Sequence, residues 1–500
     1  MLYWWVNYKS TDFPSEQYVT LPRTLPLSQS PLFCTCRNIF AGARQDITMD
    51  TRPTKRPDIV KHADPDPIAY EAEVYQRGLR YQRPPFTFKS LEWEPLASER
   101  MSADARGYVL GSAGTGETAS KNRAAFAKWS IVPRRLGLGI TAKAKGTKKG
   151  VFPSLDVEVL GKKLPCPIAC APVGVQKIMN PEGELATARA AAREKVPFIM
   201  STASSTSIED VARASDEGAA TSDGNGKAER WYQLYWPARE HDDITISLLD
   251  RARRAGFSVL VVTLDTYILG WRPSDMDNGY NPFLRSDQVG VAIGLTDPVF
   301  REHFKKKHGR DVDDEMGAAA AEWTRTIFPG TGHTLDDVAF LRSHWDGPIV
   351  LKGIQCADDA REIAESGLVD GIVVSNHGGR QADGGMSSLG ALPGIVEAVK
   401  GIPNNGRTGR DLEVLFDSGI RTGADVAKAL ALGASMCLVG RPYVYGLVLG
   451  GEEGVAHVLR SLLGDLELTL HLSGIESVAP EHLNRGVLVR EDELFKVAET

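Results

Sequence analysis

The sequence predicts a single α/β fold of the (β/α)8 type, in which eight parallel strands, each followed by a helix, close into a TIM barrel. Three observations predict it. Eight short apolar runs recur along the chain, helical segments rich in alanine and leucine lie between most of them, and polar side chains gather where the runs end. A chain of 500 residues can hold such a barrel together with additional segments.

The eight apolar runs are the predicted strands. In chain order they are Ile168 to Ala171, Pro197 to Ser201, Trp231 to Tyr235, Ser258 to Thr263, Pro348 to Lys352, Gly371 to Ser375, Leu412 to Asp417 and Met436 to Gly440. The segments Glu184 to Lys195, Ile244 to Ala255 and Ala424 to Leu432 favour helix because alanine and leucine have high helix propensity. Residues 273–347 separate the fourth and fifth runs. So long a connection predicts an insertion or a lid over the barrel.

The segments outside the barrel differ from it in composition. The chain divides into an extension over residues 1–48, an irregular arm over 49–100, the barrel over 101–480 and a tail over 481–500. The extension contains Trp4, Trp5 and several prolines with little periodicity, and the arm is polar and proline-rich. No signal-peptide core is evident, and acidic residues are poor features for a mitochondrial transit peptide, so we expect a cytoplasmic protein.

Composition narrows the function classes. The net charge is −6 and the pI is about 6.0, which argues against nucleic acid or an anionic membrane as the main partner. No apolar stretch reaches the length of a membrane-spanning helix. The six cysteines lack the paired spacing of a disulfide framework or a zinc site. We therefore expect a reducing, intracellular setting and no metal.

Polar residues at the ends of the runs indicate a site on one rim of the barrel. They are Ser201, Gln233, Tyr235, Thr263, Asp265, Lys352, Ser375, His377, Arg380 and Asp417. Any one of them can be a helix cap or a satisfied buried polar group, and that reading is the better one for Ser201 or Ser375 alone. Ten such residues at the carboxyl ends, where barrels of this kind build their active sites, favour a functional site.

The most informative run is Ser375 to Gln381, which follows the apolar segment Gly371 to Val374. It presents His377 and Arg380 together where a buried strand opens into a loop. An imidazole can take a proton near neutral pH, and a guanidinium can hold a carboxylate with two parallel hydrogen bonds. This pair suits chemistry on a small acid whose α-carbon loses a proton or a hydride.

The last two units carry the pattern of a phosphate site. Asp417 to Asp425 is a glycine-bearing loop that opens a helix, and Gly440-Arg441-Pro442 follows the eighth run. Loops after strands seven and eight commonly bind phosphate in these barrels, through backbone N–H groups and helix N-termini. Arg421 and Arg441 can add positive charge. A simple turn is the alternative for Gly-Arg-Pro, but its position after the eighth run favours a phosphate site.

These motifs together resemble those of the FMN-dependent α-hydroxy acid oxidases and dehydrogenases. The resemblance covers about residues 100 to 475 and rests on Ser375 to Gln381, Lys352, Gln233-Leu234-Tyr235 and Thr263-Leu264-Asp265-Thr266. Within the family, the segments most similar to the lactate 2-monooxygenase branch include Val173-Gly174, Leu269-Gly270-Trp271-Arg272-Pro273 and residues 296–301. The chain departs from the commoner family pattern at Gly174, which lacks a methyl group near the flavin face, and at Ala203, where glycolate oxidase has a tryptophan.

The resemblance implies a role for each candidate residue. His377 would be the active-site base, Asp265 would pair with it, and Lys352 would lie beside the flavin. The substrate would be bound by Tyr108, Tyr235, Arg272 and Arg380. The FMN would be bound by Pro172, Val173, Gly174, Ser201, Gln233, Thr263, Lys352, Ser375, Asp417, Gly419, Arg421, Gly440 and Arg441.

The resemblance also implies a reaction. With FMN bound, the protein would oxidise an L-2-hydroxy acid such as L-lactate to the 2-keto acid, with molecular oxygen as the second substrate. A monooxygenase-like member would also decarboxylate the product, whereas a simple oxidase would release hydrogen peroxide. The alternatives are a dehydrogenase that passes electrons to a quinone or a protein, and an FMN-bearing barrel that serves only as a scaffold. The family implies a homo-oligomer, either a tetramer or an octamer.

Overall fold

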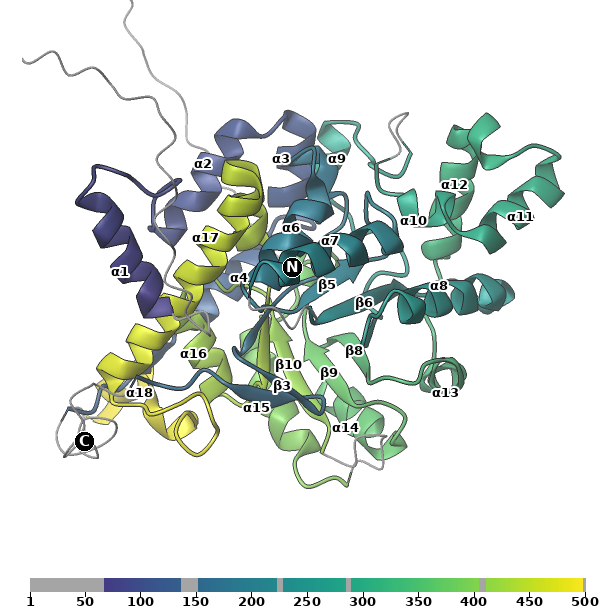
Figure 1. The fold of residues 1–500 in the computed structure, drawn as a ribbon. Helices are drawn as coiled ribbons and strands as arrows, with labels where there is room; N and C mark the ends of the chain where they lie inside the picture. Colours follow the sequence, from purple (N-terminus) through teal and green to yellow (C-terminus); the bar gives the residue numbers. More distant parts are fainter. Residues whose placement is uncertain (1–66, 136–151, 223–227, 285–288, 404–410, 498–500) are drawn as a thin grey trace, which may run out of the picture. The chain divides into compact units, whose positions relative to one another are not determined.

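Eight parallel strands close into a barrel (Figure 1). The computed structural model describes residues 67–135, 152–222, 228–284, 289–403 and 411–497, and the predicted extension over residues 1–48 lies outside them. The barrel strands are β4 (Ile168–Cys170), β5 (Phe198–Ser201), β6 (Arg230–Tyr235), β7 (Leu260–Thr263), β8 (Ile349–Ile354), β9 (Gly371–Val374), β10 (Glu413–Asp417) and β11 (Met436–Val439). All eight predicted strands are confirmed. They read as continuous apolar runs because a parallel sheet is covered on both faces.

The register of the barrel brings distant polar residues to one rim. Ser201 at the end of β5 pairs with Gln233 of β6. Thr263 at the end of β7 pairs with Lys352 of β8. Because parallel strands all point the same way, residues far apart in the sequence converge at their carboxyl ends.

Helices on the outside of the barrel follow the strands. They are α6 (Gly183–Arg193), α7 (Ile208–Ala220), α8 (Asp242–Arg254), α14 (Ala357–Ser366), α15 (Ser388–Val399), α16 (Gly423–Ala431) and α17 (Arg441–Ser473). The three helices predicted from alanine and leucine content are confirmed as α6, α8 and α16. Side-chain caps fix several starts: the Ser207 side chain accepts a hydrogen bond from the Asp210 N–H at α7, and Thr422 and Asp425 form a capping box at α16.

The long connection between the fourth and fifth barrel strands is confirmed, and it is largely helical. Its described elements are α9 (Pro273–Asp277), α10 (Ala292–Leu295), α11 (Pro298–His308), η4 (Val312–Asp314), α12 (Met316–Ile327) and α13 (Leu335–His344). Trp323 is fully buried and its ring contacts Phe300 edge-on at 5.2 Å. Arg251 of α8 donates to the Ile293 carbonyl and lies 3.3 Å from Asp297. These contacts attach the connection to the barrel; that it acts as a lid stays a prediction.

The N-terminal arm is more regular than predicted. Its described part forms α1 (Pro67–Gly78), η1 (Ser90–Glu92) and α2 (Trp93–Arg100), followed by α3 (Ala103–Leu110) and α4 (Glu117–Ala127). The prediction of an irregular arm is wrong here because these short helices depend on tertiary contacts. Trp93 and Ala97 are buried, and α1 and α2 both pack against α17. Pro95 lies in the first turn of α2, where its missing N–H costs nothing.

Two small sheets complete the described chain. The strand β1 (Trp129–Ile131) pairs with β12 (Leu488–Arg490), so the predicted tail is tied to the chain before the barrel. The hairpin of β2 (Val157–Val159) and β3 (Lys162–Leu164) packs with apolar side chains inside the barrel. The remaining described elements are η2 (Gln176–Ile178), η3 (Arg239–His241), η5 (His377–Gly379), η6 (Arg485–Val487) and α18 (Glu491–Val497). Within the described ranges, no helix is both long and apolar enough to span a membrane.

The contact between α16 and α17 gives a stability prediction. A Cβ atom at Gly423 would lie 2.0 Å from the Leu466 nitrogen, so the two helices meet only because this residue is glycine. We expect Gly423→Ala to destabilise the protein by about 1–3 kcal/mol through overpacking. Thermal unfolding of the protein measures this. The control is Gly317→Ala in α12, where nothing lies within 4 Å and alanine should be neutral or stabilising. Equal unfolding midpoints for the two variants would contradict the prediction.

Candidate active site

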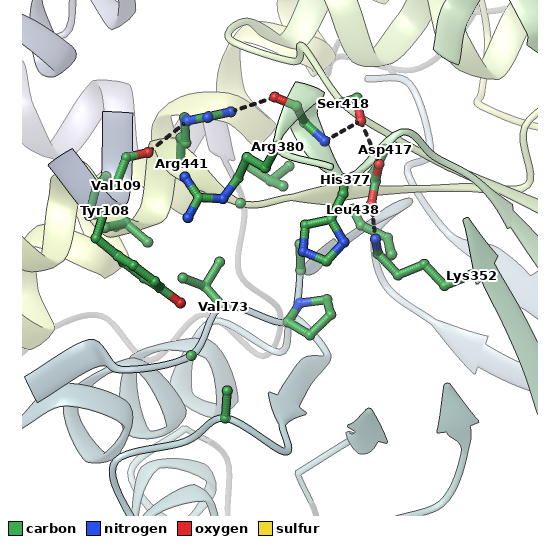
Figure 2. A pocket seen from close by; sticks show the side chains of 18 of the residues that line it. Tyr108, Val109, Val173, Lys352, His377, Arg380, Asp417, Ser418, Leu438 and Arg441 are labelled. Carbon is green, nitrogen blue, oxygen red and sulfur yellow. Dashed lines mark hydrogen bonds and ion pairs between the residues drawn. The ribbon is translucent and has the colours of Figure 1, made fainter. Parts of the chain in front are cut away.

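One cavity opens at the carboxyl ends of the barrel strands (Figure 2). The empty space at this opening, open solvent included, is about 990 Å³. The predicted residues that line it are Tyr108, Pro172, Val173, Gly174, Tyr235, Arg272, Lys352, His377, Arg380, Asp417, Gly419, Arg421, Gly440 and Arg441. Five predicted residues do not line the cavity. Each of them contacts a lining residue or the neighbour of one; they are Ser201, Gln233, Thr263, Asp265 and Ser375.

His377 is held by two polar neighbours. Its Nδ1 donates to Asp265 Oδ1 at 2.8 Å, and the Thr266 hydroxyl, 3.1 Å from the same nitrogen, donates to that carboxylate at 2.8 Å. A carboxylate can only accept, so this contact places the proton on Nδ1 and leaves Nε2 free to act as a base. Burial lowers the pKa of His377, against the opposing effect of Asp265, so the ring is neutral near pH 7. The sequence motif Thr263 to Thr266 contains this threonine, but its contact with Asp265 follows only from the fold.

The backbone at His377 is in the left-handed region, with φ of 58°. Such a conformation is uncommon for a residue other than glycine and needs support from its surroundings. The support comes from the Ser375 hydroxyl, which accepts from the His377 N–H at 3.0 Å, and from Asn376, whose side chain accepts from the Gly379 N–H. The short helix η5 is thereby fixed from within.

Lys352 is a buried ammonium with two partners. Its Nζ donates to the Ser375 hydroxyl at 3.0 Å and lies 3.3 Å from Asp417 Oδ2. Burial alone would lower the pKa of Lys352, but Asp417 and Asp265 more than offset it and raise the pKa. Burial would likewise raise the pKa of Asp265, yet His377 and Lys352 hold it below its usual value. Lys352 therefore stays charged beside the cavity.

Two guanidiniums share the other side of the cavity. Burial, together with the positive charges of Arg272 and Arg441, lowers the pKa of Arg380 to about 9. Arg380 donates to the Gly111 carbonyl at 2.8 Å and lies over the Tyr108 ring at 5.0 Å. Among the described residues, neither Arg272 nor Arg380 has an ion-pair partner. Such a pair is suited to bind a carboxylate.

Aromatic side chains continue from the arginine pair along the cavity. Tyr235 lies 5.1 Å from the Phe328 ring, and Phe328 lies 5.3 Å from Phe283. Burial raises the pKa of both Tyr108 and Tyr235, so their phenols remain hydrogen-bond donors. Phe283 and Phe328 belong to the long β7–β8 connection, and sequence reasoning missed them because no strand end marks their position.

Gly174 and Ala203 are in close contact on another part of the cavity lining. A Cβ atom at Gly174 would lie 2.7 Å from both the Cβ and the carbonyl oxygen of Ala203. The glycine is therefore required by the approach of the neighbouring loop. It does not simply enlarge the cavity by one methyl group.

The far end of the cavity has the features of an anion site. Helix α17 begins after Gly440 without a side-chain cap, which leaves the N–H groups of its first turn, apart from Pro442, without a side-chain acceptor. Ser418 and Gly419 both have positive φ, at 86° and 93°, and turn the loop after β10 toward this end. Arg441 donates to three backbone carbonyls, of Val109, Gly378 and Gly111, and Arg421 pairs with Glu94.

A chain of contacts links the two ends of the cavity (Figure 2). Arg441 donates to the Gly378 carbonyl, the Gly378 N–H donates to the Ser418 hydroxyl, and that hydroxyl donates to Asp417 at 2.7 Å. Asp417 in turn pairs with Lys352. The anion-binding end and the buried ammonium are therefore positioned by one connected network.

The donors around the cavity fit the FMN that the sequence resemblance implies. The Gln233 Nε2 is buried without a hydrogen-bond partner among the described residues, while its Oε1 accepts from Ser201 at 2.9 Å. An amide N–H in that state calls for an acceptor such as a flavin carbonyl. The uncapped start of α17 and Arg441 suit a phosphate. In the part of the chain that the structure describes, no cluster of three metal-ligating side chains occurs.

Comparison with known proteins agrees with these features. The family model described as FMN-dependent dehydrogenase matches residues 97–489. The FMN-dependent alpha-hydroxy acid dehydrogenase of Schizosaccharomyces pombe is 58% identical over 427 residues, which are 85% of this chain and 97% of that protein. The L-lactate oxidase of Lysinibacillus sphaericus is 37% identical over 84% of this chain and 97% of its own.

A solved structure shows the same likeness. Mandelate oxidase superposes with a TM-score of 0.62 and 33% identity, covering 79% of this chain and 96% of the other. This protein therefore belongs to the family of FMN-dependent α-hydroxy acid dehydrogenases and oxidases, and it is an FMN-dependent oxidoreductase of (β/α)8 fold.

Proposed function

We propose that this protein oxidises an L-2-hydroxy acid such as L-lactate to the 2-keto acid, and that molecular oxygen is the second substrate. One observation carries the proposal. A neutral, largely buried imidazole held by Asp265 shares a cavity with Arg272 and Arg380, which have no ion-pair partner among the described residues. A base beside a carboxylate-binding pair matches an acid whose α-carbon is oxidised.

The FMN would be held by residues on both sides of the cavity. Its phosphate would be bound by Arg441, Gly419 and the start of α17, with Arg421 nearby. Its ring would be bound by the backbone of Pro172 to Gly174 and by the polar side chains Ser201, Gln233, Thr263, Ser375 and Lys352. When bound, FMN supplies the acceptor for the two electrons that leave the substrate. The Lys352 ammonium, which Asp417 keeps charged, would stabilise negative charge there.

The protein's own residues would orient the acid and move its proton. Arg272 and Arg380 bind the carboxylate, and the Tyr108 and Tyr235 phenols donate to substrate oxygen atoms. His377 takes a proton at Nε2. Asp265 stabilises the imidazolium that forms, because its negative charge lies 2.8 Å from Nδ1. Each group is in place before the substrate arrives, which reduces the cost of reorganisation.

The fate of the product distinguishes three versions of this function. An oxidase converts lactate and oxygen to pyruvate and hydrogen peroxide. A monooxygenase-type enzyme converts the same pair to acetate, carbon dioxide and water, which requires that the products of the first step stay together. The β7–β8 connection, which supplies Phe283 and Phe328 to the cavity, favours such retention. A dehydrogenase uses an acceptor other than oxygen.

The first test mixes the FMN-bound protein with L-lactate in the absence of oxygen and records the visible flavin absorbance. We expect the absorbance to bleach, and to return when air is admitted. Acetate without peroxide indicates the monooxygenase version, and pyruvate with peroxide indicates the oxidase. Slow recovery in air indicates a dehydrogenase and contradicts oxygen as the second substrate. A flavin that neither lactate nor larger L-2-hydroxy acids bleach contradicts the proposal.

The second test addresses His377. We expect His377→Gln to lower kcat by about 10²- to 10⁴-fold, the usual contribution of a general base, while FMN content is unchanged. In the unsubstituted protein, kcat/KM should hold steady as the pH falls from neutral. It should decline only below the ordinary imidazole value, because burial lowers the pKa of His377 and protonation removes the base. His303→Gln on α11, outside the cavity, is the control and should leave both quantities unchanged.

A decline of kcat/KM that begins well above the ordinary imidazole pKa would contradict this assignment. So would a His377→Gln variant that retains most of the original kcat.

A further inference from the structure

Gln381 closes the informative run Ser375 to Gln381, and the proposed function gives it no role. Its side-chain amide joins two loops that carry the site. Oε1 accepts from Arg272 Nη2 at 2.7 Å and from the Gly270 N–H at 3.2 Å. Nε2 donates to the Asp265 carbonyl at 2.8 Å and to the Ile268 carbonyl at 2.9 Å.

These four hydrogen bonds fix the orientation of the amide. Oε1 faces two N–H donors and Nε2 faces two carbonyl acceptors, so a flipped amide would place like groups against each other. Both donor positions of the amide nitrogen are used. Gln381 therefore spans more than a hundred residues of sequence to bind one face of the loop after β7.

We propose that Gln381 is a positioning residue that holds Arg272 in place to bind the substrate carboxylate. This inference rests on the proposed function, in which Arg272 and Arg380 bind that group. The Arg272 guanidinium lines the cavity and is largely buried. Its hydrogen bonds among the described residues go to one segment, from Nε to the Arg380 carbonyl at 3.1 Å and from Nη2 to Gln381.

Backbone packing also brings the loop after β7 against the segment that contains Gln381. A Cβ atom at Gly270 would lie 2.5 Å from the Gln381 carbonyl oxygen and 2.7 Å from that of Arg380. The two loops are therefore in direct contact at this point. The amide therefore acts where the two backbones already touch. Without the amide, Arg272 Nη2 would lose its acceptor while the positive charge of Arg380 stays close.

The choice of glutamine has a physical reason. A neutral amide oxygen can fix a guanidinium without cancelling its charge, so the charge remains available for the substrate carboxylate. A glutamate would fix Arg272 equally well but would neutralise it. It would also bring a carboxylate oxygen toward the carbonyl oxygens of Asp265 and Ile268, which now accept hydrogen bonds.

The experiment uses the FMN-bound protein with Gln381→Leu, Gln381→Glu, Arg272→Ala and the double variant Gln381→Leu with Arg272→Ala. For each variant we measure steady-state KM and kcat with the acid that the unsubstituted protein turns over. FMN content and thermal unfolding are measured as well. Acetate, a carboxylate that cannot be oxidised in this way, is titrated while the flavin absorbance is recorded. The matched control is Gln355→Leu, at a second glutamine whose amide donates only to the Met386 carbonyl among described residues.

We expect Gln381→Leu to raise KM about 10- to 100-fold, which corresponds to loss of a hydrogen bond to a charged group. The value of kcat should change far less, and FMN content and the unfolding midpoint should match the Gln355→Leu control. Gln381→Glu should raise KM as well. The double variant should be no worse than Arg272→Ala alone, because both changes remove the same interaction. Acetate affinity should fall in parallel with the rise in KM.

Several outcomes would overturn the inference. A KM within twofold of the original in Gln381→Leu or Gln381→Glu would show that the amide does not position the carboxylate site. Parallel losses of kcat, FMN and thermal stability, with acetate affinity unchanged, would indicate a structural role only. Additive effects in the double variant would show that Gln381 acts independently of Arg272. The acetate titration measures carboxylate binding and does not depend on turnover. It therefore tests the role of Gln381 even if the unsubstituted protein fails to oxidise the proposed substrate.

Discussion

Positive charge held away from water around one cavity is the constraint on which the rest of the site depends. Lys352, Arg272 and Arg380 reach this cavity from the ends of different strands, and the low pKa of Arg380 reflects the cost of burying them together. Asp265 and Asp417 compensate part of this charge. Burying a charge is costly unless a group of opposite charge pairs with it. The phosphate of the cofactor and the carboxylate of an acid are partners of the required sign.

Neutral acceptors hold the guanidiniums of this cavity in place without consuming their charge. Arg380 and Arg441 both donate to the Gly111 carbonyl, and Arg441 also donates to the carbonyls of Val109 and Gly378. A carboxylate in the same positions would fix the guanidiniums and also neutralise them. The proposed role of the side-chain amide at the third guanidinium follows the same rule. The fold thereby positions charge with backbone groups and leaves it available for ligands.

The barrel and its rim were predictable from sequence because both follow from local pattern. Strands buried on both faces must be apolar, and strand ends must carry the polar residues that face a common cavity. The arm was not predictable, because the burial of Trp93 depends on where α17 lies. Phe283 and Phe328 reach the cavity through the packing of a long connection, and the bonds of Gln381 cross between loops. Such tertiary contacts leave no periodic signal in the chain.

On the proposed assignment, catalysis and substrate size are determined by different segments. The base, the ammonium and the arginine pair lie on the ends of barrel strands and the loops that follow them. Side chains fix the base and the ammonium, and hydrogen bonds to backbone carbonyls help to fix the arginines. The contact of Gly174 with Ala203 leaves no space for a side chain at that position. Phe283 and Phe328, which the β7–β8 connection supplies, line the cavity and limit the room for the side chain of the acid. Changes in that connection can alter which acid fits while the residues that perform the oxidation stay in place.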